Sequence, residues 1–312
     1  MEVTDVRTLI VHNPHSGFGS DAIFEFERAL LDDGDECVFR ILDHNSGNDD
    51  ERLADAEEFD LVVISGGDGT VSHALYILNN RDVVSCVFPS GTANLLAANI
   101  GNATEPAALA AACRAGLTFL ADLGEMRWSN TAGKEFVKGF ALMSGTGFDA
   151  QLMSDAKPAK QLLGQAAYFA AVLANPQPEV LNLTIEVDGE VYHHQGISCL
   201  VANNAMMQGE IEIVPDCSMA DGMLDVIVLE TTDTAQLLKP LAAGIVDPAG
   251  RDIKRPHIAS YRGREIKVTS DKPMKLEVDG DVAPGEVLSW QARILPSCCR
   301  IIIDPMSRYA QK

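Results

Sequence analysis

Residues 61–78 read LVVISGGDGTVSHALYIL, and this stretch decides the fold. Its first four residues are all apolar, which is typical of a strand buried on both faces of a sheet. Residues 70–78 carry apolar side chains at helical spacing. A glycine-rich turn, residues 65–70, joins the two patterns. The stretch therefore predicts a buried strand, a tight turn and a helix, which is the repeating unit of an α/β domain.

The same alternation of strand and helix patterns extends over the first ~125 residues. Strands that alternate with helices imply a mostly parallel sheet with helices on its faces. The further strands are expected at residues 6–12, 37–42 and 83–88, and the further helices at residues 22–31, 93–99 and 107–115.

The second half has the pattern of an antiparallel β-sandwich or barrel. Residues 181–187 alternate apolar and polar side chains and are followed by the turn pair Asp188-Gly189, which predicts a hairpin. The expected domains are residues 1–125 and 126–299, with a tail from about residue 300 that packs back onto the first domain. Further strands are expected at residues 198–202, 224–229, 265–269, 274–278 and 300–303, and helices near residues 160–174 and 234–241.

The glycine-rich turn also predicts a phosphate-binding loop. Gly66, Gly67 and Gly69 let the backbone approach a bulky anion, and the N–H groups at the helix start point at it. Asp68 would be repelled by phosphates unless a cation such as Mg²⁺ lies between them. The alternative is a plain tight turn in which the Asp-Gly pair is chosen for its backbone angles. No Gly-Lys-Ser/Thr follows, so this is not a Walker A loop.

Two other strand ends carry compatible signals. Residues 13–17 (NPHSG) follow the first strand and residues 89–94 (PSGTAN) follow the fourth. Ligands of open α/β sheets bind outside the carboxyl ends of the strands, so three polar, glycine-containing ends favour a nucleotide site. For Asn13 and Asn94, a hydrogen bond to the loop backbone is expected as much as contact with a ligand.

Together these motifs resemble the diacylglycerol kinase catalytic family, which includes sphingosine kinases and bacterial lipid kinases. The resemblance rests on NPHSG at residues 13–17, GGDGT at 66–70 and GTAN at 91–94, then on GTGFDA at 145–150 and DGMLD at 221–225. The motifs occur in order over nearly the whole chain. The resemblance implies an N-terminal α/β domain like that of NAD kinase and phosphofructokinase, a C-terminal antiparallel β-sandwich, and an active site between them.

The resemblance also implies roles for individual residues. Asp68 would hold a catalytic Mg²⁺ through its waters, and a second, structural Mg²⁺ would be bound by Asp221 and the carbonyls of Ser218 and Met223. The ATP phosphates would be held by Ser65, Gly66, Gly67, Asp68, Gly69, Thr70 and Val71, with help from Thr92 and, as above, Asn13 and Asn94.

Asp281 would replace the glutamate that the family uses as general base on the lipid hydroxyl. Aspartate is one methylene shorter, so its reach differs. From the residues alone, Asp279-Gly280 is a hairpin turn and Asp281 is a surface residue. The chain also has Leu95 where the family often has aspartate, and Phe18 where it usually has a basic residue.

Charge and hydropathy narrow the class of partner. The net charge of -21 disfavours nucleic acid as a partner and also repels anionic membranes. No apolar helical stretch is long enough to span a bilayer and no secretory signal is expected, so we expect a cytoplasmic protein that meets a lipid substrate at the membrane surface. One local basic cluster could face that surface, and for any single cluster ordinary solvated charges are the more common alternative. The candidate clusters are Lys157 with Lys160, Arg251 with Lys254 and Arg255, and Arg262 with Arg264 and Lys267. The sequence is compatible with a homodimer and does not predict the oligomeric state.

The expected function is that of an ATP- and Mg²⁺-dependent lipid kinase, which transfers the γ-phosphate to a hydroxyl of diacylglycerol or a related lipid. One alternative is a kinase of a soluble acceptor such as NAD, which shares the GGDG motif. Another is a nucleotide-binding regulatory protein that has lost catalysis.

Overall fold

The chain folds into two compact units. Unit 1 comprises Met1–Asp122 and Ser297–Lys312, and unit 2 comprises Leu123–Pro296. The sequence-based divisions fall after residue 125 and near residue 300. The computed structural model describes residues 6–17, 21–32, 34–42, 48–147, 178–207, 211–212, 214–233, 236, 247 and 253–310.

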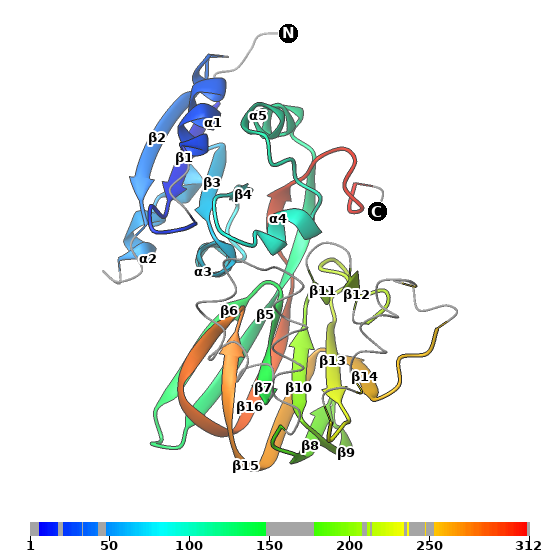
Figure 1. Ribbon diagram of the computed structural model, residues 1–312. Helices are drawn as coiled ribbons and strands as arrows, with labels where there is room; N and C mark the ends of the chain where they lie inside the picture. Colours follow the sequence, from blue (N-terminus) through cyan, green and yellow to red (C-terminus); the bar gives the residue numbers. More distant parts are fainter. Residues whose placement is uncertain are drawn as a thin grey trace. The chain divides into compact units, whose positions relative to one another are not determined.

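Unit 1 contains a parallel sheet with the strand order β2-β1-β3-β4-β16, of which only the last residues of β16 take part. Strand β3 is buried throughout, as its unbroken apolar run predicts. Figure 1 shows the strands and their helices. The strands are β1 (Arg7–His12), β2 (Glu36–Ile41), β3 (Leu61–Gly66) and β4 (Val84–Pro89), and the helices are α1 (Ala22–Leu31), α2 (Asp49–Arg52), α3 (Asp68–Leu78), α4 (Leu95–Asn99) and α5 (Pro106–Ala115).

One face of this sheet is covered by α1 and α5. Helix α1 buries Phe26 and α5 buries Leu109 against the strands, which contribute Ile10, Val63 and Phe88. Helix α5 has the end signals of a stable helix, since a proline stands in its first turn and Gly116 closes it with φ +67°. This packing fixes where strands β1, β3 and β4 end, which is where the predicted nucleotide loops lie.

Unit 2 is built from antiparallel strands. Two long strands, β15 and β16, form its centre; β8 and β9 extend the first half of β15, while β7, β10, β13 and β14 follow from its second half. The strands are β5 (Thr118–Asn130), β6 (Glu135–Phe140), β7 (Met143–Gly147), β8 (Leu181–Val187), β9 (Glu190–Gly196), β10 (Ser198–Ala202), β11 (Met206–Met207), β12 (Ile211–Glu212), β13 (Leu224–Leu229), β14 (Ile258–Gly263), β15 (Glu265–Val278) and β16 (Asp281–Ile302).

A bulge in β15 lets one strand serve two groups of partners. The register against β16 shifts between Thr269 and Met274, and Pro273 lies within that interval. Proline cannot donate to the ladder, so a bulge is where it is tolerated. The sequence accordingly predicted two strands, residues 265–269 and 274–278, where the structure has one interrupted strand.

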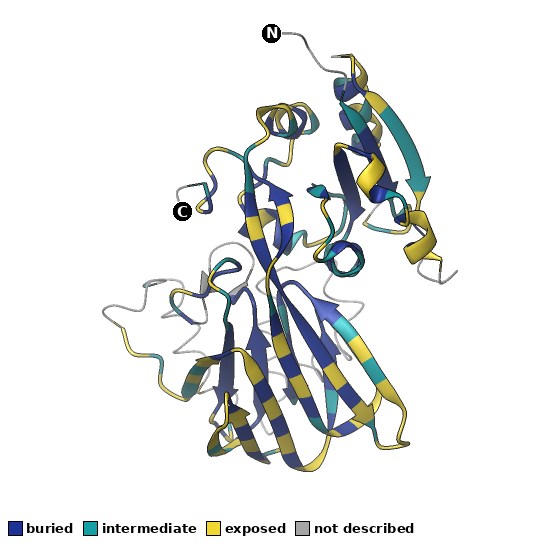
Figure 2. Ribbon diagram, turned by 180° about the vertical axis from the view of Figure 1, so that it is seen from behind, coloured by how far each residue is buried: buried dark blue, intermediate teal, exposed yellow. Residues whose placement is uncertain are grey.

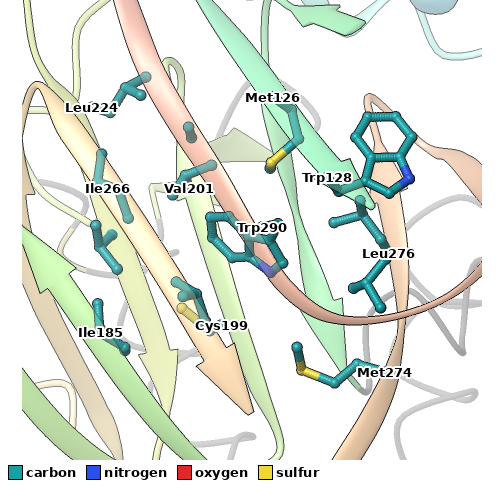
Figure 3. Packing of buried hydrophobic residues seen from close by; sticks show 14 of the residues in the cluster. Met126, Trp128, Ile185, Cys199, Val201, Leu224, Ile266, Met274, Leu276 and Trp290 are labelled. Atoms are coloured by element: carbon teal, nitrogen blue, oxygen red, sulfur yellow. The ribbon is translucent and has the colours of Figure 1, made fainter. Parts of the chain in front are cut away.

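The hydrophobic core of unit 2 is formed by the buried side chains of its strands. Buried and exposed residues alternate along them (Figure 2), and the buried ones meet around Trp290 (Figure 3). Trp290 is 1% exposed and donates its indole N–H to the Thr146 hydroxyl at 3.1 Å. Burying a tryptophan with its N–H satisfied gives this core both its largest apolar contribution and a fixed geometry.

The fold class agrees with the sequence prediction, although several elements differ in extent. Strands β5, β6, β7 and β14 were not predicted, and β16 was predicted only at residues 300–303. Strand β16 contains Pro284, Gly285 and Pro296; Gly285 takes φ +82° and the strand continues past both prolines. The predicted helix at 160–174 and all but one residue of that at 234–241 lie outside the described residues. No helix in the described part of the chain could span a membrane.

Candidate functional site

Three loops meet at one edge of the sheet in unit 1. They follow β1, β3 and β4, which are parallel neighbours, so their carboxyl ends lie side by side. The Gly67 N–H donates to the Ser16 hydroxyl at 3.1 Å, and the Asn13 amide donates to the Thr70 hydroxyl at 2.8 Å. The first and second predicted phosphate loops are therefore hydrogen-bonded to each other.

The loops also approach one another closely at glycines, where backbone lies against backbone with no side chain between them. A Cβ on Gly91 would lie 2.4 Å from the Gly67 Cα, and a Cβ on Gly17 would lie 2.4 Å from the Ser90 carbonyl oxygen. Gly17 has φ +64°, which favours glycine on its own account. Only glycine fits at positions 17 and 91, so the close approach of the loops explains these glycines of the first and third motifs.

Helix α3 begins inside this cradle. Gly67 is its N-cap in an extended conformation, and Asp68 stands in the first turn. The first N–H groups of a helix have no intrahelical acceptor and, with the helix dipole, favour an anion. Val71 is 2% exposed and its N–H donates to the Gly67 carbonyl at 3.0 Å. It therefore belongs to the helix and its core, and its contact with ATP stays a prediction.

The Asp68 carboxylate is oriented by a backbone group. Its Oδ1 accepts the Leu96 N–H at 2.9 Å, which ties the start of α3 to the start of α4. This bond fixes the side chain that the resemblance assigns to Mg²⁺. It also supplies a carboxylate to the first turn of α4, which begins at Leu95.

Both predicted amide ligands are used inside their loops. The Asn94 side chain accepts the Gly91 N–H at 2.7 Å and donates to the Gly91 carbonyl at 2.9 Å. Asn13 accepts the His15 N–H at 3.0 Å besides its bond to Thr70. Asn13 and Asn94 thus shape the loops, and their contact with ATP stays a prediction. Thr92 is exposed in the third loop.

Unit 2 holds the predicted general base on a rigid turn. Asp281 opens β16 directly after the turn Asp279-Gly280, and its exposed carboxylate lies 3.0 Å from the Lys138 ammonium group. The Asp279 carboxylate accepts the N–H groups of Ala141, Leu142 and Met143 at 2.7, 3.0 and 3.0 Å. These bonds hold the turn, and Asp281 with it, against the β6–β7 connection.

The predicted structural metal ligands share one loop of unit 2. The Met223 N–H donates to Asp221 Oδ1 at 3.0 Å, and the Arg262 guanidinium lies 3.7 Å from Asp221 Oδ2. Arg262 also pairs with the buried Asp225 at 3.0 and 3.1 Å, and this hydrogen bonding raises the arginine pKa. Arg262 is therefore paired with carboxylates of its own unit, and a membrane-facing role for its cluster stays a prediction.

The donor chemistry of the predicted ligands fits magnesium, although the described residues form no ready-made carboxylate cluster. Within the described residues, no three His, Cys, Asp or Glu side chains are grouped to hold a metal ion. The set formed by Asp221 with the carbonyls of Ser218 and Met223 consists of oxygen atoms alone, which suits a hard cation that keeps several waters. Asp68 likewise offers a carboxylate oxygen for a magnesium ion, and the nucleotide phosphates would supply further oxygen ligands.

A hollow of about 360 Å³ lies elsewhere on unit 2. It is lined by charged residues, including Arg127 and Arg293, which both lie 2.8 Å from the buried Glu125 carboxylate. None of the predicted site residues lines it. Its cations and carboxylates balance, and it has the character of a solvated, charge-paired sheet face.

Sequence reasoning missed several residues of these sites. Ser16 and Ser90 stand inside quoted motifs, but nothing in the sequence showed that Ser16 accepts the Gly67 N–H or that Ser90 packs on Gly17. Lys138 and Asp279 act across chain separations of 143 and about 137 residues, so only the strand pairing brings them to their partners.

Comparisons with known proteins agree with this architecture. The diacylglycerol kinase catalytic domain matches residues 7–126, and the YegS C-terminal NAD kinase beta sandwich-like domain matches residues 143–303. Diacylglycerol kinase of Bacillus subtilis (strain 168) is 26% identical over 303 residues, 92% of this chain and 95% of that protein. Diacylglycerol kinase of Mycobacterium tuberculosis (strain H37Rv) is 27% identical over 246 residues, 77% of each chain.

Solved structures show the same fold. A diacylglycerol kinase from Bacillus anthracis strain Sterne superposes with a TM-score of 0.72 at 19% identity, covering 96% of this chain and 97% of that one. Yeast NADH kinase superposes with a TM-score of 0.52 at 12% identity, covering 97% and 84%. Because the two domain matches occur in order and together cover most of the chain, this protein belongs to the diacylglycerol kinase catalytic domain family, with a YegS-type C-terminal β-sandwich domain.

Proposed function

We propose that this protein is an ATP- and Mg²⁺-dependent lipid kinase that transfers the γ-phosphate to a hydroxyl group of diacylglycerol or a related lipid. The observation that carries the proposal is the meeting of three glycine-lined loops at the ends of β1, β3 and β4, with Gly67 and Gly91 in backbone contact. Such a cradle at a helix start suits a polyphosphate. The relatives named above are diacylglycerol kinases, which supports the choice of acceptor.

In this proposal, unit 1 holds the nucleotide. The N–H groups at the start of α3 and the third loop with Thr92 receive the phosphate oxygens. Mg²⁺, when bound, would neutralise charge on the phosphates and so make the γ-phosphoryl group more open to attack. Asp68, oriented by the Leu96 N–H, would hold that ion through its waters. Asp221 with the carbonyls of Ser218 and Met223 would hold the structural one.

Unit 2 would supply the base. Phosphoryl transfer depends mainly on positioning and charge neutralisation, with one carboxylate near the attacking oxygen. Asp281 would accept the proton of the lipid hydroxyl, and Lys138 at 3.0 Å would orient the carboxylate. The N–H groups that donate to the Asp279 carboxylate hold the turn from which Asp281 projects, which supports a defined backbone position for the base.

The proposal is tested by a transfer assay with γ-labelled ATP and Mg²⁺ over a panel of lipids in mixed micelles, with NAD as a soluble acceptor. Labelled phosphatidic acid, or another phosphorylated lipid, is the expected product, and Asp281→Ala should lower its rate by about 100-fold. Labelling of NAD in place of every lipid would make the protein a kinase of a soluble acceptor. ATP binding without transfer to any acceptor would indicate a regulatory protein. Either result would refute the proposal.

A further inference from the structure

Three side chains at the ends of neighbouring strands form a hydrogen-bonded row. His12 is the last residue of β1, Ser65 lies near the end of β3, and Ser90 follows β4 directly. The His12 Nδ1 lies 2.9 Å from the Ser65 hydroxyl, which lies 3.1 Å from the Ser90 hydroxyl. The row crosses the base of the three-loop cradle, although its first and last members are far apart in the sequence.

The hydrogen bonds of this row can run in one of two directions, from His12 to Ser90 or from Ser90 to His12, because each hydroxyl carries a single proton. Ser65 is fully buried, so its proton goes to one of its two neighbours in the row. When Ser65 donates to Ser90, as the geometry at 3.1 Å allows, its oxygen must accept the Nδ1 proton of His12. Ser90 is partly exposed in the third loop, so its own proton is then directed outward. In the opposite direction, Ser90 donates inward and presents only lone pairs.

An outward-pointing hydroxyl proton suits an anion, whereas outward lone pairs repel one. The imidazole of His12 determines which of these two directions the row takes, and its position is fixed by its neighbours. It packs against Phe24 and Phe39, with ring centroids at 6.5 and 5.7 Å, and those two rings stack on each other at 5.5 Å. Burial lowers the pKa of His12, which favours the uncharged ring with a single N–H. With that proton on Nδ1, the ring donates to Ser65 and the row runs outward to Ser90.

From this geometry we infer that His12 is a positioning residue for phosphate binding. It donates Nδ1–H to Ser65 and thereby directs the Ser90 hydroxyl proton toward a nucleotide phosphate in the cradle. The inference rests on the proposed function for the identity of the ligand, but it assigns to His12 and Ser90 roles that the sequence motifs do not give.

The test is the affinity of the full chain for Mg·ATP, measured by isothermal titration calorimetry. His12→Leu should raise the Kd about fivefold to tenfold, since one oriented hydrogen bond to a charged group is lost. His12→Asn should stay within about twofold of the unsubstituted chain, because the asparagine amide can place a donor where Nδ1 stands. His193→Leu is the matched control: its Nδ1 also pairs with a hydroxyl, that of Thr184 at 3.3 Å, but on unit 2. It should leave the Kd unchanged.

A double-mutant cycle separates this role from a general effect on folding. Ser90→Ala should weaken Mg·ATP binding by itself, and adding His12→Leu should then have little further effect, because both changes interrupt one row. Additive losses, or an unchanged Kd in His12→Leu, would overturn the inference. Transfer measured in parallel keeps the two proposals apart: Mg·ATP binding that responds to His12 without any phosphate transfer refutes the kinase function alone.

Discussion

The turn that carries Asp281 offers a sharp test, because the protein contains a near copy of it. Asp279-Gly280 joins β15 to β16 with φ +48° and +82°, and Asp188-Gly189 joins β8 to β9 with φ +49° and +88°. In both turns the aspartate carboxylate accepts N–H groups from a neighbouring segment. Asparagine tolerates this left-handed conformation, so Asp→Asn changes the carboxylate and leaves the turn type intact.

The expected loss of stability follows from the hydrogen bonds. Asp279 accepts three N–H groups through its two oxygens, Ala141 at Oδ2 and both Leu142 and Met143 at Oδ1. In Asp279→Asn an NH₂ group replaces one oxygen, so the Ala141 N–H would face a donor. One lost charge-assisted bond at a partly exposed site corresponds to about 2 kcal/mol. For a unit of this size that lowers the Tm by about 4–8 °C.

The control is the same substitution in the other turn, which does not carry the base. Asp188 accepts the Arg264 N–H at 3.0 Å and the Glu265 N–H at 2.8 Å through Oδ1, and Oδ2 receives only a second branch of the Arg264 N–H at 3.1 Å. Asp188→Asn can keep Oδ1 as the acceptor of both N–H groups, so it should lower the Tm by less than Asp279→Asn. Only Asp279→Asn should lower kcat, by about tenfold or more, because it loosens the segment that holds Asp281. Differential scanning calorimetry and the lipid transfer assay at a temperature where both variants are folded measure the two effects.

The reasoning would be refuted if the two variants lost the same fraction of activity, since the turn that carries Asp281 would then matter no more for transfer than the turn between β8 and β9. It would also be refuted by a folded Asp279→Asn protein with unchanged kcat. In that case the position of Asp281 would not depend on the backbone bonds to Asp279, and Asp281 would lose its main structural support as the base.

Three further outcomes are expected. Asp68→Asn should reduce transfer by about 100-fold while circular dichroism and Tm stay close to those of the unsubstituted chain, because the amide can keep Oδ1 as an acceptor. The hydrogen bond from Arg40 lowers the pKa of Asp55 to about 2, so the stabilisation is present above about pH 4 and is lost as the pH falls toward 2. In urea titrations Asp55→Asn should thus be less stable at pH 7, by at most about 1 kcal/mol for so exposed a pair, and equal to the unsubstituted chain near pH 2. Trp290→Phe should cost about 2–3 kcal/mol of unfolding free energy by loss of packing and of the bond to Thr146, with little change in kcat per folded molecule.

The sequence alone predicted the parts of the site that are local in the chain. The apolar run of β3, the glycine-rich turn after it and the helix that follows could be read from one window. The rule that parallel strands present their carboxyl ends together then brought the loops at residues 13–17 and 89–94 to the same edge.

The parts that depend on strand order could not be predicted. His12 meets Ser65 because β1 pairs with β3 as well as with β2, and no periodicity in the sequence states this. Lys138 meets Asp281 across 143 residues through the arrangement of unit 2. The bonding of Val71 could not be read from its motif either: the helix uses its N–H for an intrahelical bond to the Gly67 carbonyl.

Hydrogen–deuterium exchange of the backbone amides, with and without Mg·ATP, tests most directly whether the three strand-end loops hold a nucleotide. Slower exchange should appear in the peptides that cover residues 13–17, 65–70 and 89–94 together, and should weaken in His12→Leu at the same concentration of Mg·ATP. Unchanged exchange at saturating Mg·ATP in all three loops, or protection confined to unit 2, would contradict the account.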